Sequence, residues 1–162
     1  MSKINLLVIS PKDLGALRNL VQLRDCAEIS ISNDAAELAK LAAAAEVILL
    51  TGLPRTSMNL QTLWKLAKSV RWVHSLSAGV ENTLFPALVE STVPLTNARG
   101  VFKRPLAEFA MLGILFHFKK VRRLIDNQNR HKWDDFSVKL ADRRVMGIVG
   151  FGEIDFVGFI RG

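Results

Sequence analysis

Short apolar runs alternate with helix-like segments along the first hundred residues, and this alternation restricts the fold more than any other feature of the chain. Apolar runs bounded by Ser, Pro, Gly or Asn predict strands. The predicted strands lie at residues 4–9, 27–31, 47–50, 71–74 and 93–96, and the strand at 27–31 alternates apolar and polar residues. Single helices are predicted between them, so consecutive strands are joined by right-handed crossovers into a mainly parallel sheet with helices on both faces.

Five strand–helix units of this kind predict an α/β domain of the flavodoxin-like type over residues 1–100. The runs at 4–9 and 47–50 are apolar at almost every position, which is typical of strands covered on both faces. Asn33 or Asp34 is expected to cap the helix predicted at 35–45, because a short polar side chain accepts hydrogen bonds from the free N–H groups of the first turn.

A different pattern covers residues 105–129, where a single long helix is predicted with Pro105 in its first turn, a position that tolerates proline. The first half of this helix is apolar almost all round, and the second half narrows to Val121, Leu124 and Ile125. A helix that is apolar on every side must be buried on every side. Residues 101–162 are therefore predicted to begin a second domain, whose helix packs against another domain or subunit.

Residues 144–149 are predicted to form a sixth strand that runs directly into a glycine-containing turn. A strand that turns through Gly-x-Gly into a helix opens a dinucleotide-binding unit, in which the glycines let a pyrophosphate approach the backbone at the helix N-terminus. Position 155 is Asp where the fingerprint has a third glycine, and its negative side chain would oppose a diphosphate. The predicted cofactor-binding residues are Gly150, Phe151, Gly152, Glu153 and Ile154.

A second turn of small residues, Ser75 to Glu81, directly follows the predicted strand at 71–74. Ligands of parallel α/β sheets bind at the carboxyl ends of strands, and a small-residue turn there presents backbone N–H groups to a carboxylate. The alternative interpretation is a tight strand–helix connection with Gly79 at a positive φ, which needs no ligand. Further on, residues 97–101 are interpreted as a hinge before the long helix.

Composition excludes several other classes of function. Cys26 is the only cysteine, so a reducing cytosol is expected, and neither a zinc site nor a cysteine nucleophile is supported. The most apolar stretch, 105–118, is too short to span a bilayer. The net charge of +7 is concentrated at 103–144, with eleven Lys or Arg against five Asp or Glu, but no nucleic-acid-binding pattern accompanies it. The three histidines have no triad-like neighbours, so no catalytic residue and no metal ligand is assigned.

Three segments, in this order, resemble the D-isomer-specific 2-hydroxyacid dehydrogenases. They read SAGVE at 77–81, TNARGVFKRPLAEFAMLGIL at 96–115 and LADRRVMGIVGFGEI at 140–154. The resemblance implies a flavodoxin-like substrate domain, into which a Rossmann domain that binds NAD or NADP is inserted. It also implies hydride transfer between the nicotinamide and a small 2-oxo or 2-hydroxy acid. Ser77, Ala78, Gly79 and Val80 would hold the substrate carboxylate through backbone amides, and the helix at 105–129 would be a dimerisation arm that forms a homodimer.

The catalytic Arg, Glu and His of this family lie beyond the glycine turn, so the 162 residues are expected to be an inactive fragment that stops after the first strand of its Rossmann domain. Residues 155–162 fit no helix of the family, and a frameshift, early stop or misjoined exon after Ile154 is our hypothesis for them. The main alternative is a non-catalytic module that pairs with a full-length relative through the arm, and a nucleic-acid binder is the third interpretation.

Overall fold

The computed structural model describes residues 3–10, 15–51 and 56–149. The chain forms two compact units, Met1–Arg99 and Gly100–Gly162. None of the helices in the described ranges is both long and apolar enough to cross a membrane.

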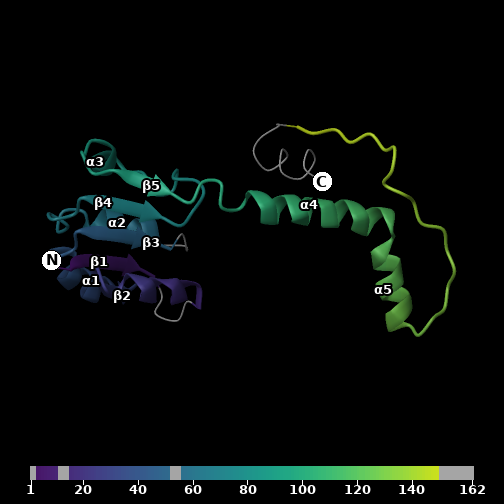
Figure 1. Cartoon of the computed structure of the whole chain (residues 1–162), viewed down its shortest axis with the longest axis horizontal. Coiled ribbons are helices and arrows are strands. Elements are labelled where there is room, and N and C mark those ends of the chain that lie inside the picture. The colour runs from purple at the N-terminus through teal and green to yellow at the C-terminus, as the bar shows by residue number, and fades with distance from the viewer. Residues whose placement is uncertain (1–2, 11–14, 52–55, 150–162) are drawn as a thin grey trace. The chain divides into compact units, whose positions relative to one another are not determined.

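The first unit is built on a parallel five-stranded sheet in the order β2-β1-β3-β4-β5 (Figure 1). This is the flavodoxin-like order, so the predicted fold class is confirmed. The observed bounds agree with the predicted strands within two residues at each end. The strands are β1 Ile4–Ile9, β2 Ala27–Ser32, β3 Val47–Leu50, β4 Trp72–Ser75 and β5 Leu95–Asn97.

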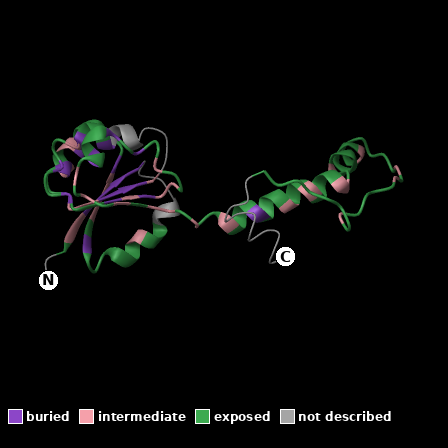
Figure 2. Cartoon of the chain, turned by 90° about the horizontal axis from the view of Figure 1, so that it is seen from above, coloured by how far each residue is buried: buried purple, intermediate pink, exposed green. Residues whose placement is uncertain are grey.

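Successive side chains of a strand point to opposite faces of the sheet. Each face is covered by a core of its own. Leu7 and Ile9 of β1 belong to the larger core, which contains buried residues of α1 (Ala35–Ala42), α2 (Thr56–Leu63) and α3 (Pro86–Val89). Leu6 and Val8 belong to the second core, against which Leu20 of the 3-10 helix η1 (Gly15–Leu23) packs. Figure 2 shows buried residues gathered in the sheet.

Helix α1 begins at the predicted cap. The Asp34 carboxylate accepts a hydrogen bond of 2.9 Å from the N–H of Glu37, while the Glu37 carboxylate accepts one of 2.6 Å from the Ser32 hydroxyl. An N-cap of this kind stabilises a helix by about 1 kcal/mol. Asp34, rather than Asn33, therefore fixes the start of this helix after β2.

The single helix predicted at 105–129 is wrong, because the structure has two helices, α4 (Lys103–Phe118) and α5 (Val121–Asn129) (Figure 1). Lys120 adopts the left-handed conformation at φ 51°, which costs a non-glycine residue roughly 1–2 kcal/mol. The break leaves the Phe118 carbonyl without its partner in the helix, and the N–H of Lys139 donates to it at 3.0 Å. Contacts of the segment after α5 thus offset the broken helix.

The strand predicted at 144–149 is also wrong, since the structure has no strand there. Val145 and Val149 are fully exposed. A strand must pair its backbone groups with a neighbour, and the described part of the second unit contains no other strand to pair with. An apolar β-type pattern therefore does not form a strand in this segment.

Candidate functional site

The turn at residues 76–80 lies at the carboxyl end of β4, beside the end of β5. The two strands pair in parallel with Ser75 opposite Asn97, so the residues that follow each strand lie next to one another. The N–H of Leu76 donates to the Leu50 carbonyl at 2.8 Å, which ties the start of the turn to β3. The turn thus occupies the sheet edge where ligands of parallel α/β folds bind.

Two consecutive carbonyls of this turn accept hydrogen bonds from the end of β5. The N–H of Ala98 donates to the Ser77 carbonyl at 3.1 Å, and the Asn97 side-chain amide donates to the Ala78 carbonyl at 2.6 Å. The N–H of Ser77 is used locally and donates to the Ser75 hydroxyl at 3.3 Å. Both carbonyls therefore face residues 97–98.

The N–H groups of Ala78 and Gly79 are left to face the other way. In a trans peptide the carbonyl and the following N–H point in opposite directions, and the described residues contain no cis peptide. Neither N–H donates a hydrogen bond to another described residue, and both residues are exposed. Two adjacent N–H groups of this kind are suited to an anion such as a carboxylate.

Gly79 does not have the positive φ that the alternative interpretation required, and among the described glycines a positive φ occurs at Gly100, with 87°. The positive φ predicted for Gly79 is therefore wrong, whereas the tight connection without a ligand stays an alternative interpretation of the turn. A Cβ on Gly79 would overlap the end of the Glu81 side chain, whose Cδ would lie 3.2 Å away. The missing side chain leaves room for the Glu81 carboxylate, which lies beside Gly79.

Val80, the last predicted substrate-binding residue, stabilises the next turn of the chain through its carbonyl. Its carbonyl accepts hydrogen bonds from the N–H groups of Thr83 at 2.8 Å and Leu84 at 3.1 Å. His74 is held within the sheet, where its Nδ1 lies 2.7 Å from the Thr96 hydroxyl. In the part of the chain that the structure describes, no cluster of His, Cys, Asp or Glu could hold a metal ion.

The predicted cofactor-binding residues Gly150, Phe151, Gly152, Glu153 and Ile154 lie outside the described residues. Residues 144–149 lack the strand with which a dinucleotide-binding unit starts, so the described part of the second unit does not supply a cradle for a cofactor.

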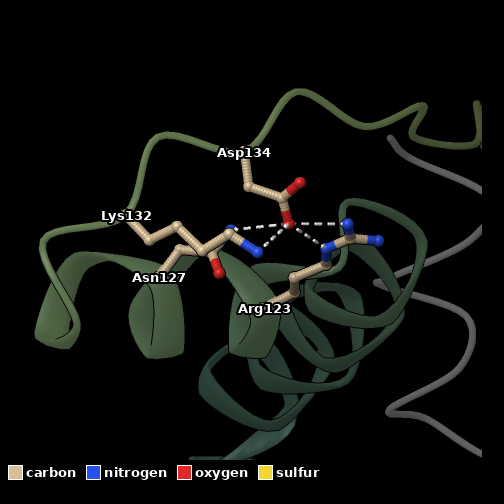
Figure 3. A network of polar contacts seen from close by, with 4 residues as sticks. All are labelled: Arg123, Asn127, Lys132 and Asp134. Atoms are coloured by element: carbon tan, nitrogen blue, oxygen red, sulfur yellow. Dashed lines mark hydrogen bonds and ion pairs between the residues drawn. The ribbon is translucent and has the colours of Figure 1, made fainter.

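The second unit instead contains a polar cluster around Asp134, which the sequence analysis missed (Figure 3). One carboxylate oxygen of Asp134 lies 2.7 Å from Nη2 and 3.1 Å from Nε of Arg123, 3.3 Å from Nδ2 of Asn127 and 4.0 Å from Nζ of Lys132. Hydrogen bonds from Arg123 and Asn127 lower the pKa of the Asp134 carboxyl below its usual range. The Arg123 guanidinium also lies 4.4 Å from the centre of the Phe136 ring.

This Asp134 cluster fastens the segment after α5 to the helix. Arg123 and Asn127 are four residues apart and share one side of α5, and Asp134 reaches them from the following segment. No spacing in the sequence distinguishes Asp134 from the adjacent Asp135. The sequence therefore contains no pattern from which this cluster could be predicted.

Comparison with known proteins identifies relatives for nearly the whole chain. The family model described as the catalytic domain of D-isomer specific 2-hydroxyacid dehydrogenase matches residues 5–155. A search of curated proteins finds no match.

The similar solved structures include a 2-hydroxyacid dehydrogenase from Ketogulonicigenium vulgare Y25, with a TM-score of 0.74 and 20% identity over 99% of this chain and 51% of that one. An NADPH-dependent glyoxylate/hydroxypyruvate reductase from Sinorhizobium meliloti, in complex with NADP and malonate, has a TM-score of 0.73 and 20% identity over 99% of this chain and 50% of that one. The chain thus spans about half the length of these structures.

Proposed function

Because the chain belongs to the D-isomer specific 2-hydroxyacid dehydrogenase family, we propose that its first unit binds the carboxylate of a small 2-hydroxy or 2-oxo acid. The whole protein is then an oxidoreductase that uses NAD or NADP. This proposal rests on the N–H groups of Ala78 and Gly79, which donate no hydrogen bond to any other described residue. Hydrogen bonds from N–H groups to an ionised acceptor are short and about twice as strong as neutral ones.

The ligands of a relative agree with a carboxylate site. Solved structures of the Sinorhizobium meliloti reductase are complexes with NADP and malonate in one case and with citrate in another, and both acids carry carboxylates. In the present chain, we propose that the substrate carboxylate is bound by the turn that contains Ser77, Ala78, Gly79 and Val80.

The nicotinamide cofactor is proposed to approach Gly150, Phe151, Gly152, Glu153 and Ile154, and when bound it supplies or accepts the hydride. The described residues before this turn do not form a cradle for the cofactor.

Residues 1–162 alone are proposed to be inactive. Reduction of a 2-oxo acid needs a cation that polarises the carbonyl and a group that moves the proton. Among the described residues, the side chains that hydrogen-bond to the turn at 76–80 are those of Ser75 and Asn97, and neither is a cation or a general acid.

A homodimer is proposed through helix α4, which exposes a stripe of large apolar side chains. Phe109 is 73% exposed and Leu112 is 58% exposed, and Phe116 follows one turn further along the same side. Contiguous apolar surface of this kind marks an interaction site in most proteins. The same stripe supports the second candidate, a non-catalytic module that pairs with a full-length relative.

NMR titration of the 162-residue polypeptide with oxamate, a stable 2-oxo carboxylate, tests the carboxylate site. Saturable shifts of the Ala78 and Gly79 amide signals are expected at constant ionic strength, while acetamide, which lacks the negative charge, gives none. Oxamate shifts that are absent from these two amides, or that are equal across the first unit, would overturn the proposal.

A further inference from the structure

We propose that Asn97 is a positioning residue for the substrate carboxylate. Its side-chain amide fixes the peptide between Ala78 and Gly79 so that this peptide presents a donor, and not an acceptor, to the ligand. This role rests on the proposed carboxylate site. Asn97 itself does not touch the substrate in this scheme, because it contacts the opposite side of the turn.

Asn97 is held by both ends of its amide. Its Nδ2 donates to the Ala78 carbonyl at 2.6 Å, and its Oδ1 accepts from the N–H of Arg99 at 3.4 Å. The backbone of Asn97 is fixed as the last residue of β5, in register with Ser75 of β4. The amide therefore has one orientation that satisfies both partners, and in that orientation the N–H side faces the turn.

The Ala78–Gly79 peptide needs such a hold because glycine offers little resistance to rotation. Gly79 has no Cβ, so a flip of the preceding peptide meets few steric barriers. A flipped peptide would place the Ala78 carbonyl oxygen where the N–H now stands, and this oxygen would repel a carboxylate. The bond of 2.6 Å from Asn97 is lost in the flipped state, so Asn97 favours the donor orientation.

The neighbouring peptide, between Ser77 and Ala78, is fixed by a different hydrogen bond. The Ser77 carbonyl accepts from the backbone N–H of Ala98, a bond that no side-chain substitution at position 97 removes. A substitution of Asn97 should therefore free the N–H of Gly79 while that of Ala78 stays in place. This difference between two adjacent amides separates a positioning role from a general loss of stability.

The test compares Asn97→Ala and Asn97→Asp with the control Thr96→Val in oxamate titrations followed by NMR. The Thr96 hydroxyl accepts from Trp72 Nε1 at 2.9 Å and lies 2.7 Å from His74 Nδ1, both in β4, and it bonds to no described residue of the turn, so its loss perturbs the contacts between β4 and β5 and not the turn. One hydrogen bond contributes about 0.5–1.5 kcal/mol, so Asn97→Ala should weaken oxamate binding roughly two- to tenfold. Asn97→Asp should weaken it more, because an acceptor then faces the Ala78 carbonyl.

The expected pattern is a smaller oxamate shift at the Gly79 amide in Asn97→Ala, a retained shift at the Ala78 amide, and wild-type affinity in Thr96→Val. Equal affinity of Asn97→Ala and wild type would overturn the role of Asn97 and leave the carboxylate site standing. Absence of oxamate binding in the wild type would overturn the carboxylate site itself.

A second measurement covers the case in which Asn97→Ala does not fold. The side-chain amide protons of Asn97 in the wild type should shift with oxamate along the same binding curve as the Gly79 amide, because the two groups share the Ala78–Gly79 peptide. Side-chain signals of Asn97 that stay constant through saturation would overturn the proposal.

Discussion

Replacement of Leu112 and Phe116 together by aspartate is expected to abolish the proposed dimer. Complete burial of a Leu or Phe side chain contributes about 2–3 kcal/mol. Leu112 is 58% exposed and Phe116 is 38% exposed in the chain by itself, so covering what remains adds about 2 kcal/mol in each protomer. In a two-fold symmetric interface both protomers contribute these side chains, which gives about 4 kcal/mol in total, or roughly a thousandfold in Kd at 1.4 kcal/mol per factor of ten.

Sedimentation velocity over a series of micromolar concentrations measures this change directly. Val89→Asp is the matched control, because Val89 is an equally accessible aliphatic residue, 64% exposed, in α3 of the first unit. The wild type and Val89→Asp should sediment as dimers, and the double variant as a monomer with unchanged helix content by circular dichroism. A monomeric wild type, or a double variant that dimerises like the wild type, would refute the assignment of α4 as the interface.

Three further results are expected. Glu81→Gln should strengthen oxamate binding in the NMR titration, because it removes the negative charge beside Gly79; unchanged or weaker binding would count against the site. Since the folded-state pKa of Asp134 is lowered from its ordinary 3.8, its stabilising contribution is present above that value and lost as the pH falls through the lowered pKa. The Phe136 ring signals should follow that loss in the wild type but not in Asp134→Asn. The purified 162 residues should not oxidise NADH with glyoxylate, even after Asp155→Gly, and saturable oxidation would contradict this.

The sheet could be predicted because the residue types of each strand reflect how that strand is buried. A parallel strand covered on both faces is apolar at nearly every position, as in β1 and β3, and the breaks between the runs are marked by residues that favour turns. The helix α1 likewise carries its own start signal in Asp34. Each of these features depends on residues that are close in sequence, so the sequence alone contains the information.

The break between α4 and α5 depends instead on residues that are distant in sequence. Neither Gly nor Pro occurs at positions 118–122, and the residues there are ordinary helix formers. The break is compensated by the bond from the Lys139 N–H to the Phe118 carbonyl and by the pair of Arg123 and Asp134. A periodicity that continues through Val121, Leu124 and Ile125 cannot reveal these contacts.

The candidate site likewise combines features that the sequence reveals with features that depend on residues distant in sequence. The position of the turn follows from the end of β4, and its small residues indicate that backbone groups are accessible. Which of those groups point outward is decided by Asn97 and Ala98, because the parallel register of β4 and β5 brings them against the Ser77 and Ala78 carbonyls. The sequence predicts a hinge at residues 97–101, because the register of β4 and β5 cannot be read from it. A backbone binding site is thus specified by the residues behind it as much as by the residues that form it.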